Sequence, residues 1–390
     1  MISANFSIQN PIKPTRKSQV TIIIVILEMG FVRLEETQKA ELQEFRRMLL
    51  SCAAVHGRKD ENGLKDRENA LEGASGDDVL LDKLVCVTSG VSYLGIAIVN
   101  QLLVDGYSVR IIVDNEEDVE KLKEMENSGE MRLINNIVEV VTAKLTDVES
   151  LTEAFDGCRG VFHTAGFVDP AGLSGYTKIM SNIEVNASNN VIKACGISPS
   201  VRHCVLTSSL LTCIWKDDSW DESFNRIDHK CWSDESVCMK KKLWYALGKL
   251  RAEKAAWEIA KEHNLKLATI CPGLITGPKF FHRNPTPTLA YLKGIQEMYT
   301  KGLLATVDIN RLAKAHVRVF QEMKKAACGR YICFDQVLDN IDGIEELARE
   351  TGLNMSSIAG GASSSNGACF ELSNGRLVNL MSRTRRCNDE

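Results

Sequence analysis

The chain has 390 residues, and it lacks a long hydrophobic run and a large excess of charge of either sign. Its most apolar N-terminal stretch, residues 20–27, is far shorter than the ~20 residues that a membrane helix needs, and Glu28 ends it. The formal net charge of −4 gives no reason to expect nucleic acid or an acidic membrane surface as a partner. These absences favour an ordinary globular protein that neither spans a membrane nor binds nucleic acid.

The thirteen cysteines include no Cys-x-x-Cys pair and no cluster with histidine at zinc-ligand spacing. Cys86, Cys204, Cys271 and Cys333 lie in apolar, strand-like runs, where thiols behave as small core hydrophobes in a reducing compartment. The odd count also argues against a complete disulfide framework. The sequence therefore predicts a cytoplasmic protein with no metal centre and no disulfide scaffold.

From residue 84 onward, short apolar runs alternate with helical segments. This alternation is typical of parallel strands joined by right-handed crossovers, with helices on both faces. It predicts an α/β fold, a doubly wound parallel sheet of the Rossmann type. The expected strands are 84–88, 109–113, 137–141, 160–163, 201–207 and 267–270, and the expected helices are 95–105, 116–126, 147–156, 179–195 and 245–263.

Composition divides the chain into four predicted parts. Residues 1–80 form an N-terminal extension that is partly helical or disordered, and residues 81–278 form the Rossmann domain. Residues 279–355 form a smaller C-terminal substrate-binding subdomain, and residues 356–390, rich in glycine and serine, form a flexible tail. The first 27 residues contain no acid, so a targeting peptide remains an alternative for the extension.

The first strand-to-helix turn is placed to bind a pyrophosphate, because amides and the dipole at a helix N-terminus favour an anion. A full fingerprint would have glycine near Ser89 and Ser92 as well, since a side chain crowds the backbone that approaches the phosphates. Serine is small and its hydroxyl can donate to phosphate, but a degenerate turn with no ligand remains open. The predicted binding residues are Thr88, Ser89, Gly90, Ser92, Tyr93, Leu94 and Gly95.

Asp114 ends the second strand, 19 residues beyond Gly95. An acid at about that distance accepts hydrogen bonds from the adenosine ribose and repels a 2′-phosphate, which favours NAD over NADP. Arg110 would reverse this preference only if its side chain reached the same pocket. The alternative is that Asp114 is a simple turn residue before a helix.

Tyr245 and Lys249 stand four residues apart on an expected helix, and Ser209 follows an expected strand. One helix face then presents a phenol and an ammonium, and a neighbouring cation favours the phenolate. Serine, tyrosine and lysine together are the parts of a carbonyl reductase. Taken alone, Tyr-x-x-x-Lys also occurs by chance on exposed helix turns.

An ordered set of motifs resembles the cinnamoyl-CoA reductase and dihydroflavonol reductase-like branch of the extended short-chain dehydrogenase/reductases. The resemblance covers roughly residues 84–335. Its motifs are the turn 88–95, Gly-Cys-Arg-Gly-Val-Phe-His at 157–163, Val-Leu-Thr-Ser-Ser at 205–209, Asp-Glu-Ser at 221–223 with Cys-Trp-Ser-Asp at 231–234, the run 244–249 with Ala252-Glu253 and Ala256-Trp257, Cys-Pro-Gly-Leu-Ile-Thr-Gly-Pro at 271–278, and Val307-Asp308 with Ala315-His316.

The resemblance implies NAD(P) as cofactor and a role for each active-site residue. Ser209 would hold the substrate carbonyl, Tyr245 would pass a proton to its oxygen, and Lys249 would lower the pKa of the phenol while binding the nicotinamide ribose. Pro272 and Gly273 would lie near the nicotinamide, or would simply form a structural turn. Positioned donors are needed because hydride transfer to carbon leaves negative charge on oxygen.

The chain also departs from the family pattern, so it resembles a divergent member. The family has Asn-Trp-Tyr-Cys-Tyr-Gly-Lys where this chain has Leu-Trp-Tyr-Ala-Leu-Gly-Lys at 243–249. Asp114 occupies the place of a family arginine that suits NADP, and Lys144 occupies the place of a family acid. The phosphate preference and the substrate therefore stay open.

Two hypotheses follow for function. The first is an NAD(P)-dependent oxidoreductase, a monomer or homodimer, that acts on a carbonyl or alcohol of a small aromatic or acyl-derived metabolite. The second is a dinucleotide-binding or protein-interaction module that has lost catalysis.

An apolar lid over the substrate, or ordinary subdomain core, would be formed by Phe280, Phe281, Pro285, Pro287, Leu289, Tyr291 and Leu292.

Overall fold

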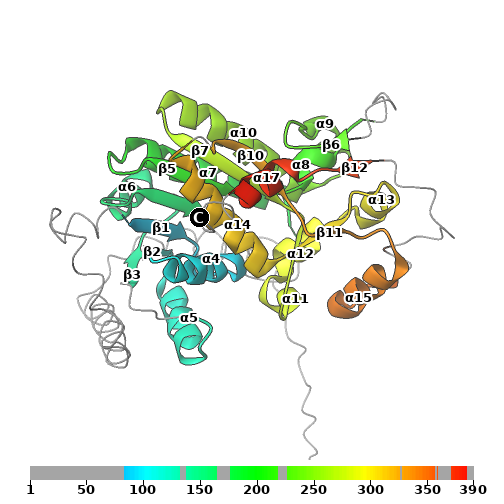
Figure 1. The fold of residues 1–390 in the computed structure, drawn as a ribbon, viewed down its shortest axis with the longest axis horizontal. Helices are drawn as coiled ribbons and strands as arrows, with labels where there is room; N and C mark the ends of the chain where they lie inside the picture. The colour runs from blue at the N-terminus through cyan, green and yellow to red at the C-terminus, as the bar shows by residue number, and fades with distance from the viewer. Residues whose placement is uncertain are drawn as a thin grey trace, which may run out of the picture. The chain divides into compact units, whose positions relative to one another are not determined.

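The computed structural model describes residues 83–131, 138–164, 176–217, 226–325, 327–355, 358 and 370–383. A seven-stranded parallel sheet forms the centre of this part of the chain (Figure 1), in the order β10-β7-β5-β4-β1-β2-β3. The prediction of a doubly wound parallel sheet is confirmed. The strands are β1 Leu84–Thr88, β2 Ser108–Val113, β3 Val138–Thr142, β4 Gly160–His163, β5 His203–Thr207, β7 Lys266–Pro272 and β10 Gly329–Cys333.

Helices cover both faces of the sheet (Figure 1). Helices α7 and α10 pack against each other on one face, with α6 beside α7, while α4 and α14 pack together on the other. Burial on both faces explains why the strands read as continuous apolar runs. The bounds are α4 Tyr93–Val104, α5 Glu116–Asn127, α6 Val148–Ala154, α7 Lys178–Ile197, α10 Trp244–Glu262 and α14 Ile309–Met323.

Gly248 allows α10 to approach α7 closely. A Cβ atom at this position would lie 2.9 Å from the Ser181 hydroxyl and 3.2 Å from the Ser181 Cα. Any larger residue would therefore push the two helices apart. The close approach brings side chains of α7 to the face of α10 that carries Tyr245 and Lys249.

The four cysteines predicted to lie in strands are buried and free. Cys86, Cys204 and Cys271 are fully buried, and Cys333 is nearly so. Cys86 and Cys204 belong to an apolar cluster of buried residues, together with Phe155 and Ile192. These thiols contribute to the core as small apolar groups.

A smaller layer follows the last turn of the Rossmann sheet. Strands β8 Leu274–Thr276, β9 Ala305–Asp308 and β11 Gln336–Val337 form a three-stranded sheet in the order β11-β9-β8. Gly273 leads into this sheet, and a Cβ atom there would lie 2.6 Å from the Ala305 carbonyl oxygen. The helices of this part are α11 Phe280–Arg283, α12 Pro285–Tyr291, α13 Ile295–Thr300 and α15 Ile341–Thr351.

Part of the segment predicted as a flexible tail is folded. Strand β12, Glu371–Leu372, pairs with β6, Arg226–Ile227, and helix α17, Gly375–Arg383, packs on α14 and β10. The Arg376 guanidinium lies 4.7 Å from the ring centroid of Tyr331. The glycine- and serine-rich composition of the segment hid this short amphipathic helix, so the prediction was wrong for residues 370–383.

The predicted extension, residues 1–80, lies outside the described residues. Within the described ranges, no helix is both long enough and apolar enough to cross a membrane. Two further short helices, α8 Leu211–Ile214 and α9 Glu235–Lys240, lie between β5 and β7 in the sequence.

Candidate active site

A pocket opens at the carboxyl ends of the strands, on the side where the sheet order reverses between β1 and β4. Open α/β sheets bind ligands at this kind of switch point. Seven of the predicted site residues line the pocket: Ser92, Leu94, Ser209, Tyr245, Lys249, Pro272 and Gly273. Nine lining residues had no predicted role or were predicted only as lid: Thr164, Thr207, Ser208, Leu274, Ile275, Asn284, Pro287, Thr288 and Tyr291.

The β1–α4 turn is tight enough to act as a cradle for a phosphate. A Cβ atom on Gly95 would lie 2.2 Å from the Ser89 carbonyl oxygen, and one on Gly90 would lie 2.6 Å from the Ile111 side chain. The two glycines that the sequence retains are therefore the two at which no side chain fits. The turn leads directly into the N-terminus of α4, whose amides favour an anion.

The two serines that replace expected glycines differ in conformation. Ser89 adopts a left-handed backbone with φ +54°, which strains a residue with a Cβ atom. Ser92 has φ −73° and is the N-cap of α4, where its Oγ accepts a hydrogen bond from the Gly95 amide at 3.0 Å. Serine in place of glycine is therefore unfavourable at position 89 only, whereas serine at position 92 stabilises the start of α4.

Replacing Ser89 with glycine is expected to stabilise the protein by about 0.5–1 kcal/mol, because relief of the left-handed strain exceeds the added chain entropy of glycine. Urea unfolding of both proteins measures the change. Ser92→Gly is the matched control, because it loses a cap in an unstrained position and is expected to lower stability by a few tenths of a kcal/mol. A less stable Ser89→Gly protein would contradict the assignment of strain.

Asp114 is exposed at the end of β2, outside the pocket itself. Partial desolvation of its carboxyl by neighbouring atoms and the nearby Asp118 raise its pKa, against the opposing effect of Lys144. Arg110 does not compete for this place: its Nε donates to Glu139 at 2.8 Å, and its Nη1 donates to the Ala154 carbonyl oxygen at 2.7 Å. Asp114 as a ribose ligand stays a prediction.

Thr88 and Tyr93 support the turn from outside the pocket. The Thr88 hydroxyl and His163 Nδ1 lie 2.8 Å apart, and Thr164 donates to the Thr88 carbonyl oxygen at 2.8 Å. Burial, with a smaller effect from Lys249, lowers the pKa of His163 to about 3, so the imidazole is neutral at physiological pH. The Tyr93 hydroxyl donates to the Pro278 carbonyl oxygen at 3.4 Å and ties the turn to the smaller layer.

Ser208 and Ser209 follow β5 and make different contacts. The Ser208 hydroxyl donates to Glu253 at 2.6 Å, so this hydrogen bond directs its proton away from a ligand in the pocket. The Ser209 Oγ accepts the Leu211 amide at 3.2 Å, which orients the hydroxyl and leaves its proton for a ligand. The geometry therefore distinguishes the two adjacent hydroxyls, and the role of Ser209 in holding a substrate carbonyl stays a prediction.

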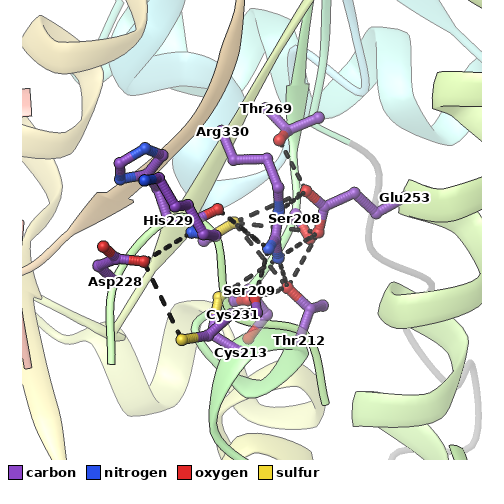
Figure 2. Close-up of polar contacts among 12 residues, drawn as sticks. Ser208, Ser209, Thr212, Cys213, Asp228, His229, Cys231, Glu253, Thr269 and Arg330 are labelled. Carbon is purple, nitrogen blue, oxygen red and sulfur yellow. Dashed lines mark hydrogen bonds and ion pairs between the residues drawn. The ribbon is translucent and has the colours of Figure 1, made fainter. Parts of the chain in front are cut away.

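Behind these serines lies a buried ion pair that sequence reasoning missed (Figure 2). The Arg330 Nε donates to Glu253 at 2.7 Å, and the guanidinium lies 3.6 Å from the ring centroid of Trp232. Thr212 and Thr269 also donate to Glu253, at 2.9 and 2.7 Å. Burial alone would raise the pKa of Glu253, but Arg330 and these hydrogen bonds outweigh it and lower the pKa, so the carboxylate is charged.

Tyr245 and Lys249 lie together on α10, as predicted, with the ammonium 5.8 Å from the centroid of the phenol ring. Lys249 Nζ also lies 2.6 Å from Glu184 Oε1 on α7, and both side chains are buried. Burial raises the pKa of Glu184, and Lys249 opposes that rise. Burial and the negative charge of Glu184 raise the pKa of Tyr245 above its ordinary value, so the predicted lowering by Lys249 is not what this geometry gives.

The residues predicted to form either a lid or ordinary subdomain core lie in different surroundings. Pro287 and Tyr291 line the pocket, Phe280 is buried, and Leu289 is exposed. The aromatic run thus divides between pocket wall, core and surface. Glu184, in mid-helix, and Arg330, inside a strand, had no motif to mark them.

Comparison with known proteins identifies the family that this chain resembles. Residues 86–291 match the model of the 3-beta hydroxysteroid dehydrogenase/isomerase family. The chain is 35% identical over 274 residues to cinnamoyl-CoA reductase 1 of Petunia hybrida, covering 68% of this chain and 77% of that protein. It is 33% identical to tetraketide alpha-pyrone reductase 1 of Arabidopsis thaliana, covering 67% of this chain and 78% of the relative.

The chain belongs to the extended short-chain dehydrogenase/reductases, in the cinnamoyl-CoA reductase and dihydroflavonol reductase-like family. Solved structures confirm the fold of this reductase family: vestitone reductase from alfalfa has a TM-score of 0.53 at 24% identity, over 76% of this chain and 91% of that one. The yeast methylglyoxal/isovaleraldehyde reductase complexed with NADPH has a TM-score of 0.58 at 20% identity, over 77% and 93%. As a member of the family, the protein is an NAD(P)-dependent oxidoreductase.

Proposed function

We propose that this protein reduces a carbonyl group of a small aromatic or acyl-derived metabolite, with Ser209, Tyr245 and Lys249 as its catalytic residues. The observation that carries the proposal is that all three side chains line one pocket, at the switch point of a dinucleotide-binding sheet. The bound dinucleotide supplies the hydride.

The residues of the chain divide the remaining work. Ser209, oriented by the Leu211 amide, donates a hydrogen bond to the substrate oxygen. Tyr245 donates the proton that this oxygen needs as negative charge develops on it. Lys249, the turn 88–95, Pro272 and Gly273 hold the cofactor, and Asp114 binds its adenosine ribose.

Tyr291 narrows the class of substrate. Its side chain lines the pocket and is 4% exposed, and no described residue accepts its hydroxyl proton. A buried hydroxyl left without an acceptor is costly, so a ligand oxygen is its expected partner. Leu94, Leu274 and Ile275 add apolar wall beside polar groups such as Asn284 and Thr288. The pocket thus suits a carbonyl compound that offers both an apolar surface and a second oxygen.

Matched pairs of aromatic and acyl carbonyl compounds, with and without a second oxygen near the carbonyl, test this function. Oxidation of NADH or NADPH by the protein is the measurement. We expect turnover, with kcat/KM about 10-fold or more higher for the member that gives Tyr291 an acceptor, since a lost hydrogen bond in a buried site costs about 1–3 kcal/mol.

Tyr291→Phe is the matched variant for this prediction. It is expected to remove the preference within each pair while turnover of the simpler member is retained. Calorimetric titration with NAD, NADH, NADP and NADPH separates the alternatives. Tight binding with no turnover of any carbonyl would favour the non-catalytic module over a reductase.

A further inference from the structure

The helix α7 places a carboxylate inside the proposed catalytic group. Glu184 is 1% exposed and forms an ion pair with Lys249 at 2.6 Å. The hydroxyl of Tyr176 donates to the other carboxylate oxygen of Glu184. The Tyr176 ring in turn packs edge-on against Tyr245, with the centroids 5.1 Å apart. Glu184 therefore lies at the centre of a cluster that includes the buried Lys249 and the partly exposed Tyr245.

The charges in this cluster do not favour a phenolate. A lone Lys249 would stabilise the deprotonated form of Tyr245, but the carboxylate of Glu184 offsets that cation at contact distance. Among the described residues, the other titratable groups of this cluster add no positive charge: Tyr176 and Tyr291 are phenols, and His163, which interacts with Lys249, is buried and neutral. The cluster is close to neutral with the phenol protonated, and it would carry an unbalanced negative charge with the phenolate.

Resting on the proposed function, we propose that Glu184 is a positioning residue that holds Lys249 and keeps the Tyr245 phenol protonated, which biases the site toward carbonyl reduction and against alcohol oxidation. In reduction, the carbonyl carbon accepts a hydride and its oxygen accepts the Tyr245 proton, while the cofactor loses two electrons. Oxidation of the alcohol needs the reverse transfer, in which a Tyr245 phenolate accepts the hydroxyl proton. Glu184 makes that phenolate scarce at neutral pH.

Glu184→Gln tests the proposal because it removes the charge and keeps the size of the side chain. A charge at this range shifts a pKa by about 1–3 units, so the alkaline limb of the reduction profile is expected to move to lower pH by about that amount. With substrate and cofactor saturating, kcat for alcohol oxidation at neutral pH is expected to rise about 10-fold or more relative to kcat for reduction, as more of the phenolate becomes available. Glu184→Asp keeps the charge and is expected to keep the wild-type limb.

Glu297→Gln is the control for a general loss of negative charge. Glu297 lies on α13 in ion pairs with Lys241 and Lys301, outside the pocket, and its variant is expected to leave both profiles unchanged. An unmoved profile in Glu184→Gln, or the same shift in Glu297→Gln, would overturn the proposal.

A second measurement keeps this test separate from that of the proposed function. The ultraviolet difference spectrum between each protein and its Tyr245→Phe counterpart reports formation of the Tyr245 phenolate without any substrate. It is expected to appear at lower pH in Glu184→Gln than in the wild type. If no carbonyl is turned over, the proposed function fails, but the spectroscopic titration of Tyr245 still tests the role of Glu184. The same Tyr245 titration in the wild type and in Glu184→Gln would reject that role.

Discussion

Phenylalanine at position 245 is expected to lower kcat by about 10²–10⁴-fold, because the substrate oxygen loses its proton donor. The change removes one oxygen atom from a partly exposed side chain, so the ring keeps its edge-on contact with Tyr176. Steady-state oxidation of NADH or NADPH with an active carbonyl substrate measures the loss. Dinucleotide binding by calorimetry and the unfolding midpoint are expected to stay near wild type.

Tyr299→Phe provides the matched control for this prediction. Tyr299 lies on α13, outside the pocket, so the same deletion of a phenol oxygen is expected to leave turnover intact. Retention of wild-type turnover by Tyr245→Phe would refute the assignment of the proton donor. Equal losses in both variants would point to a general effect of removing a tyrosine hydroxyl.

Methionine in place of Arg330 is expected to lower the free energy of unfolding by about 3–5 kcal/mol, because it leaves the buried Glu253 carboxylate without its cation. Glu253 is fully buried and its charge is balanced by the guanidinium at 2.7 Å (Figure 2). The variant also loses the contact with the Trp232 ring. Urea unfolding monitored by circular dichroism measures the loss.

Two further variants show whether the unpaired charge is the cause. Arg251→Met breaks an ion pair with Glu235 that is about one-third exposed on each side, and such pairs contribute about 0–1 kcal/mol. Adding Glu253→Gln to Arg330→Met removes the unbalanced charge and is expected to restore part of the lost stability. If the single Arg330 variant is no less stable than the Arg251 variant, the buried pair has no special role.

The sequence predicted the fold well because its strongest signals are local. The apolar runs of β1 to β5 and of β7 are short, continuous and spaced by helices, and six of the seven sheet strands fell on predicted segments, with no end shifted by more than two residues. The amphipathic α17 escaped prediction because glycine, serine and arginine dominate the composition around it. Its stability comes from packing on α14 and β10, which no local pattern reveals.

The clustering of Tyr245 and Lys249 was predictable because one helix motif carries both residues. Glu184 and Arg330 were not, because each acts through a partner 65 or more positions away in the sequence. Their importance appears only when α7 meets α10 and when β10 joins β7. The strain at Ser89 likewise depends on a backbone angle that residue type alone does not report.

Ser208 and Ser209 stand next to each other, one bonded to the Glu253 carboxylate and the other facing the pocket. Replacing a buried ion pair such as Arg330 and Glu253 with well-packed apolar residues raises the stability of some proteins. Here it would also remove the hydrogen bond that holds Ser208, the neighbour of the proposed donor Ser209. We therefore expect thermal stability and turnover to be coupled through the peptide bond between Ser208 and Ser209. A stabilised variant should keep the hydrogen bond between Ser208 and Glu253.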